Sequence, residues 1–62
     1  MKFKELKNGQ VFEFAGPRWS GAEVGPWMKI SKRKYMAYEI THRLNGLEIE
    51  VGSINAEVEV RL

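Results

Sequence analysis

The segment WMKISKRKYMAY, residues 27–38, places four cationic side chains between two runs of residues suited to a protein interior. The cations are Lys29, Lys32, Arg33 and Lys34. The flanking runs predict a short strand over residues 27–30 and a longer strand after a turn at residues 31–34. Cations also suit a turn between strands, because Lys discourages edge-to-edge aggregation of sheets. The segment therefore predicts two strands joined by a solvent-facing basic turn.

The longer strand is predicted to run to residue 44, because its apolar and polar residues alternate. A period of two is typical of a strand with one buried face. His42 takes an inward position on this strand. The apolar positions that define the alternation are Met36, Tyr38, Ile40 and Leu44.

An Asn-Gly pair at residues 45–46 predicts where that strand turns back. A type I′ turn needs positive φ at both central residues, and Asn-Gly is a preferred pair for it. Such a two-residue turn pairs Leu44 with Leu47 and, further along, Ile40 with Val51, which collects the apolar residues on one face. Turn chemistry and alternation thus agree on a β-hairpin.

Two further strands and a long loop are predicted in the rest of the chain. An Asn-Gly turn at residues 7–9 precedes a run that predicts a strand over residues 10–15. Alternating apolar residues predict a last strand over residues 58–62. The segment GPRWSGAEVGP, residues 16–26, holds three Gly and two Pro, so we expect it to be a long loop.

Five short strands and one long early loop within 62 residues predict an all-β fold. The first expectation is a small five-stranded antiparallel SH3-like barrel that forms one domain over residues 1–62, because closure protects the sheet edges of so short a chain. An OB-like barrel is less favoured and ranks second, because that fold usually carries a helix between strands and this chain has no room for one. A curled open meander ranks third.

Three motifs resemble small uncharacterised proteins of bacteria, phages and other mobile elements. They are FKELKNGQVFEF at residues 3–14, GPWMKISKRKYMAY at residues 25–38 and VGSINAEVEV at residues 51–60. Together the motifs span most of the chain. The resemblance implies a single domain, and it implies no activity or site residues.

Composition disfavours catalysis and metal binding. The chain has no Cys, no Asp and one His, which cannot supply the three or four protein ligands of a zinc site. No Ser lies in a nucleophile-elbow motif. We therefore expect no enzyme activity, no metal and no cofactor, although an oligomer that assembles a shared site from several chains stays open. Because no apolar run reaches the length of a signal peptide or membrane span, we expect a cytoplasmic protein without a membrane partner.

Charge is distributed unevenly along the chain, whose net charge is +2. Residues 1–34 hold eight Lys or Arg against three Glu, whereas residues 35–62 hold two Arg against five Glu. Alternate Glu in the second half is typical of a solvated sheet face. The basic half favours a partner with negative charge.

Cations beside aromatic rings favour nucleic-acid binding, because phosphates pair with Lys and Arg while bases stack on rings. Simple solvation of a turn explains the same cations. The alternative is a protein-interaction module, such as a phage-type inhibitor of a host protein, with an SH3-like groove lined by Trp19, Trp27, Tyr35 and Tyr38. The candidate nucleic-acid-binding residues are Arg18, Trp19, Trp27, Lys29, Lys32, Arg33, Lys34 and Tyr35.

Overall fold

The segment at residues 27–38 forms the hairpin at the centre of the sheet. Strands β2 (Trp27–Ser31) and β3 (Lys34–Ala37) pair antiparallel, with Lys29 opposite Tyr35 and an irregularity between Lys29 and Ser31. Residues 32 and 33 make the turn between them. The predicted short strand and turn are confirmed.

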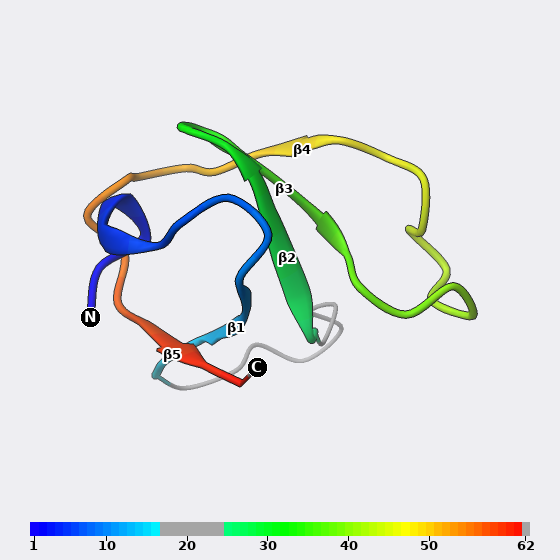
Figure 1. Cartoon of the computed structure of the whole chain (residues 1–62), viewed down its shortest axis with the longest axis horizontal. Coiled ribbons are helices and arrows are strands. Elements are labelled where there is room, and N and C mark those ends of the chain that lie inside the picture. The colour runs from blue at the N-terminus through cyan, green and yellow to red at the C-terminus, as the bar shows by residue number, and fades with distance from the viewer. Residues whose placement is uncertain (17–24, 62) are drawn as a thin grey trace.

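The computed structural model describes residues 1–16 and 25–61, and these form an all-β domain with five antiparallel strands in one sheet (Figure 1). The other strands are β1 (Val11–Phe14), β4 (Ile49–Glu50) and β5 (Val58–Val60). The strand order is β4-β3-β2-β1-β5, so β5 returns to pair with β1. The all-β fold with five antiparallel strands is therefore as predicted. Most of the predicted early loop, with Arg18 and Trp19, lies outside the described residues.

The sheet is open within the described residues, unlike the predicted closed barrel. A closed barrel would require the two edge strands, β4 and β5, to pair with each other, and β4 has only two residues to offer. Residues 54–57 bond instead to the N-terminal segment. The amide of Phe3 donates to the carbonyl of Ala56 and the amide of Lys4 to that of Ile54, both at 2.9 Å.

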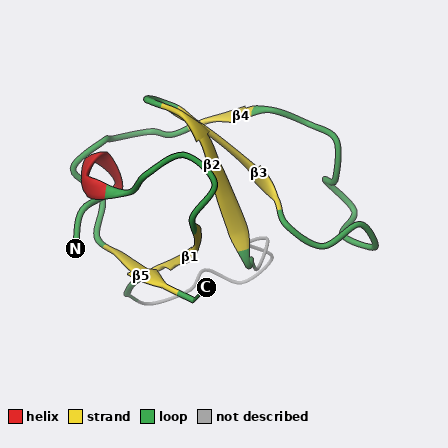
Figure 2. Ribbon diagram, in the orientation of Figure 1, coloured by secondary structure: helices red, strands yellow, loops and turns green. Residues whose placement is uncertain are grey.

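The prediction of a strand reaching residue 44 is wrong, because β3 ends at Ala37 and residues 38–46 form successive bends and turns (Figure 2). Three hydrogen bonds close these turns, at 3.1, 3.0 and 3.1 Å. They join the amides of residues 42, 45 and 47 to the carbonyls of residues 39, 42 and 44. The Asn45 side chain also donates to the carbonyl of Glu39 at 3.1 Å. Local hydrogen bonds thus replace a strand ladder here.

The predicted type I′ turn and register are wrong as well. Gly46 has a φ of 91°, but no described residue other than glycine has a positive φ, so Asn45 cannot occupy the first position of that turn type. The Leu44–Leu47 turn bond forms, yet the ladder of β3 and β4 pairs Tyr35 with Ile49. Ile40, predicted to face Val51 in the core, is 87% exposed.

Aromatic rings fill the core between the sheet and the short 3-10 helix η1 (Phe3–Glu5). The ring centroids of Phe3 and Phe12 lie 5.5 Å apart in an edge-to-face arrangement, and neither side chain is exposed. Such pairs add to the free energy gained by burial. The other buried members of the cluster are Leu6, Trp27, Ala37, Val51 and Val58.

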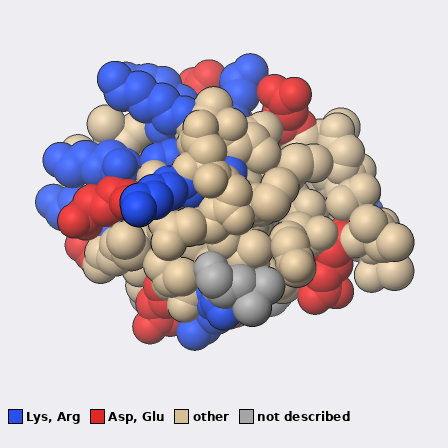
Figure 3. Space-filling view, in the orientation of Figure 1, with Lys and Arg blue, Asp and Glu red and all other residues tan. Residues whose placement is uncertain are grey.

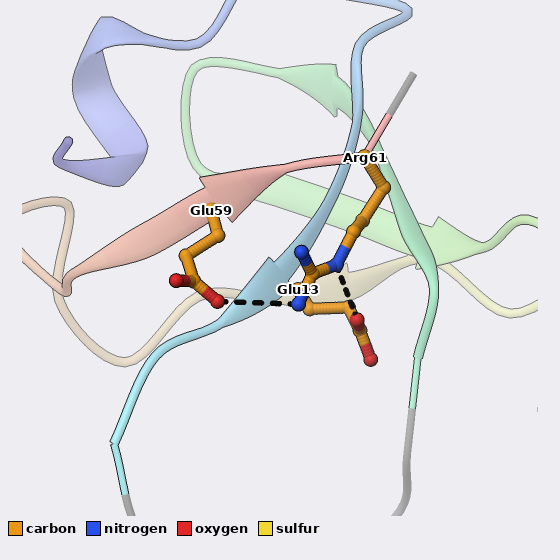
Figure 4. A network of polar contacts seen from close by, with 3 residues as sticks. All are labelled: Glu13, Glu59 and Arg61. Atoms are coloured by element: carbon orange, nitrogen blue, oxygen red, sulfur yellow. Dashed lines mark hydrogen bonds and ion pairs between the residues drawn. The ribbon is translucent and has the colours of Figure 1, made fainter.

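A network of three charged residues links β1 with β5 and the residue that follows it (Figure 4). Glu13 and Glu59 lie directly opposite each other, and like charges in that position destabilise a strand pair. The Arg61 guanidinium offsets this repulsion, donating to Glu13 at 2.5 Å and to Glu59 at 3.2 Å. These contacts, those of Glu13 above all, raise the pKa of Arg61.

Candidate functional site

The β2–β3 turn presents three exposed cations, Lys32, Arg33 and Lys34. Its backbone is fixed, since the carbonyl of Arg33 accepts a 2.7 Å hydrogen bond from the amide of Val51. The Lys34 ammonium lies 3.6 Å from the Glu48 carboxylate, and both side chains are exposed. Within residues 1–16 and 25–61, no carboxylate forms an ion pair with Lys32 or Arg33, whereas Lys34 has a weak ion pair with Glu48.

Lys29, a predicted phosphate contact, is instead buried in the core and only 4% exposed. Alternation along β2 places it on the same inward face as Trp27. Its ammonium donates to the carbonyls of Phe3 at 3.1 Å and Leu6 at 2.7 Å, and lies 4.9 Å from the centre of the Phe3 ring. Burial lowers the pKa of Lys29. Lys29 therefore holds η1 against the sheet and is withdrawn from the candidate surface.

The two rings predicted to stack on bases also pack inward. Trp27 is 5% exposed, and its ring centroid lies 5.1 Å from that of Tyr35 in an edge-to-face contact. Tyr35 is half-buried and makes similar contacts with the rings of Phe3, Phe12 and Phe14. Burial raises the pKa of the Tyr35 phenol. A base could not stack on Trp27 without opening the core.

Three exposed lysines outside the predicted site lie on and beside η1: Lys2, Lys4 and Lys7. Figure 3 shows Lys and Arg side chains gathered on the side of the molecule that carries η1 and the β2–β3 turn. The signal in the sequence was the opening MKFKELK, with three Lys in seven residues. We define the basic face as Lys2, Lys4, Lys7, Lys32, Arg33 and Lys34.

Backbone contacts join the two segments of the basic face. The amide of Gly9, two residues after Lys7, donates to the carbonyl of Lys29 at 2.7 Å, which places that turn beside β2. The carboxylate of Glu5, an anion within this region, accepts a 2.6 Å hydrogen bond from the backbone amide of Lys2. The fold thus holds the cations of the N-terminal segment near those that follow β2 in the sequence.

A second surface, the apolar loop of residues 38–48, exposes large hydrophobic side chains. Ile40 is 87% exposed, Leu47 55% and Tyr38 45%. The loop is tied to the domain by His42, whose ring lies 5.1 Å from the Trp27 ring centroid. The Nδ1 atom of His42 accepts a 3.0 Å hydrogen bond from the amide of Leu44.

A metal site needs a donor set of several side chains that can share one ion. Across residues 1–16 and 25–61, no three His, Asp or Glu side chains lie where they could share a metal ion. The described part of the chain also contains no helix long and apolar enough to cross a membrane.

Comparisons with protein-family models, with curated proteins and with solved structures found no match for this chain. The resemblance to small proteins of phages and mobile elements stays a prediction.

Proposed function

We propose that the protein is a non-catalytic module that binds nucleic acid by contacting phosphates through the basic face. The observation that carries this proposal is the meeting of two cationic segments, one at η1 and one at the β2–β3 turn, on one side of the molecule (Figure 3). Each phosphate that a Lys or Arg neutralises releases condensed counterions, which favours binding at low salt.

Preorganisation supports the proposal. Hydrogen bonds fix the backbone on both sides of the basic face, at Arg33 through Val51 and near Lys4 through Ile54. Binding then does not have to order the backbone in addition to the exposed side chains, because the backbone that carries them is already placed.

An NMR titration with a short oligonucleotide at low salt tests the proposal. The amides of residues 2–7 and 32–34 should shift most. Arg33→Gln should weaken binding and make the slope of log K against log salt shallower by about 0.9. Arg43→Gln is the matched control, because it removes the same charge from the apolar loop and should change binding less. Equal losses in the two variants would show that net charge, and not the basic face, controls binding.

The apolar loop supports a second candidate, protein interaction, because Ile40 is 87% exposed. Exposed apolar side chains that gather in one patch often mark docking sites, and Leu47 and Tyr38 of the same loop are exposed as well. Affinity capture from a nuclease-treated bacterial lysate tests it. A stoichiometric protein retained by the wild type and lost with Ile40→Ser supports this function, and equal capture by both proteins argues against it.

A further inference from the structure

We infer, resting on the proposed function, that the basic face binds double-stranded nucleic acid in preference to single strands. The inference starts from where the aromatic rings lie. Among the described residues Tyr38 is the one exposed aromatic side chain, at 45%. The rings of Phe3, Phe12 and Trp27 are buried, and those of Phe14 and Tyr35 are packed against the core.

Tyr38 lies at the wrong end of the β2–β3 hairpin to serve the basic face. Its amide donates to the carbonyl of Pro26 at 3.1 Å, just before β2 begins. The turn at Lys32 and Arg33 is at the other end of the same hairpin. The four residues of β3 lie between Arg33 and Tyr38, so the two residues are five steps apart along the chain, which corresponds to roughly 16 Å.

Proteins that bind single strands combine a cationic groove with rings on which successive bases stack. The described basic face offers cations and no exposed ring, so a single strand gains mainly phosphate contacts there. A duplex carries phosphates at higher linear density and releases more counterions for each one neutralised, about 0.9 compared with about 0.7. The face therefore discriminates in favour of the duplex.

The dimensions of the molecule limit the contact. Its extents are 26 × 24 × 20 Å. At 3.4 Å per base pair the longest extent covers roughly 7–8 base pairs. If all six cations of the basic face neutralise a phosphate, the slope of log K against log salt on a duplex is about −5, and fewer contacts make it shallower.

Fluorescence anisotropy with a 16-base-pair duplex and a 32-nucleotide oligo-dT of similar total charge tests the inference. The duplex should bind at least about five times more tightly at low salt, with the steeper salt slope. Tyr38→Ser should leave both affinities within about twofold, and Arg33→Gln should weaken duplex binding.

Equal or tighter binding of oligo-dT would overturn the duplex preference while leaving nucleic-acid binding in place. Loss of oligo-dT binding in Tyr38→Ser would also overturn it, because the ring would then be a stacking residue. If neither probe binds in a salt-dependent way, the proposed function itself fails, and the preference fails with it.

Discussion

The ammonium of Lys29 donates a 2.7 Å hydrogen bond to the backbone carbonyl of Leu6, which joins β2 to the end of η1. This buried contact lies between the two exposed segments of the basic face. Lys4 and Lys7 flank Leu6, while Lys32 and Arg33 follow Lys29 at the end of β2. A lysine inside the core thus positions lysines outside it.

Lys29→Met should therefore destabilise the protein although it removes a buried charge. Met can fill much of the same space, but it leaves the Leu6 carbonyl without its donor, and a buried unpaired acceptor costs about 1–3 kcal/mol. Lys32→Met, in the exposed turn, should change the free energy of unfolding by less than about 0.5 kcal/mol. Urea denaturation of both variants measures the difference. A Lys29→Met protein as stable as Lys32→Met would mean that the ammonium contributes nothing to the fold.

The elements predicted correctly have local patterns that no distant contact overrides. The strand near residues 10–15, the strand beginning at Trp27 and the last strand each combine a short run rich in apolar residues with a nearby turn signal. The segment at residues 38–48 carries the same signals. Its fold differs because the Asn45 side chain bonds to the carbonyls of Ala37 and Glu39, at 3.4 and 3.1 Å. Side-chain competition for backbone groups is invisible in a pattern of apolar positions.

The sequence predicts the part of the candidate site whose residues are neighbours in the sequence, and it does not predict the part that tertiary contacts bring together. The exposed turn cations followed from their place between two strands. Lys29 was misassigned because a count of neighbouring charges ignores the alternation that turns it inward with Trp27. Lys2, Lys4 and Lys7 were left out because tertiary hydrogen bonds, such as that between Lys4 and Ile54, bring their segment to the same side of the molecule.

Ile40→Gln tests whether residue 40 lies in the core, as the predicted hairpin requires, or is exposed, as in the observed turns. Ile40 is 87% exposed, so the substitution should change the free energy of unfolding by less than about 0.5 kcal/mol. Val51→Ala, at a site only 5% exposed, should cost about 1–3 kcal/mol through lost burial and the cavity left behind. Thermal or urea unfolding of both variants gives the comparison. Similar large losses would place Ile40 in the core.

Gly46→Ala should destabilise the protein through backbone strain alone. Gly46 has a φ of 91°, and a Cβ built there meets nothing within 4 Å, so no steric clash contributes. Holding a residue with a Cβ at positive φ costs about 1–2 kcal/mol. Gly52→Ala is the control, because its site is equally open and its φ is not in the positive region. That control should be neutral or slightly stabilising. Equal effects on the urea midpoint would argue against the observed turn at Gly46.

Arg61→Gln should lower stability because it leaves Glu13 and Glu59 opposite each other without the bridging guanidinium. The loss should be smaller in a Glu59→Gln background, where the repulsion is already gone, and smaller again in high salt, which screens exposed charges. Urea denaturation of the four proteins of this double-mutant cycle measures the coupling. The same loss in both backgrounds would show that Arg61 acts without reference to Glu59.

Tyr35→Phe should remove a loss of stability at high pH. Burial raises the pKa of Tyr35 above its ordinary value of 10.0. Above pH 10 the unfolded chain therefore releases the phenolic proton before the folded protein does, and the free energy of unfolding falls as pH rises. Below that pH both states keep the proton, and stability does not depend on pH through Tyr35.

The buried Lys29, whose pKa is lowered, gives a pH dependence of opposite sign, but it is present in both proteins and cancels in their difference. The wild type minus Tyr35→Phe difference in unfolding free energy, measured by urea denaturation, should stay constant up to about pH 9 and fall beyond pH 10. A difference that stays constant to pH 11 would place the Tyr35 hydroxyl in water.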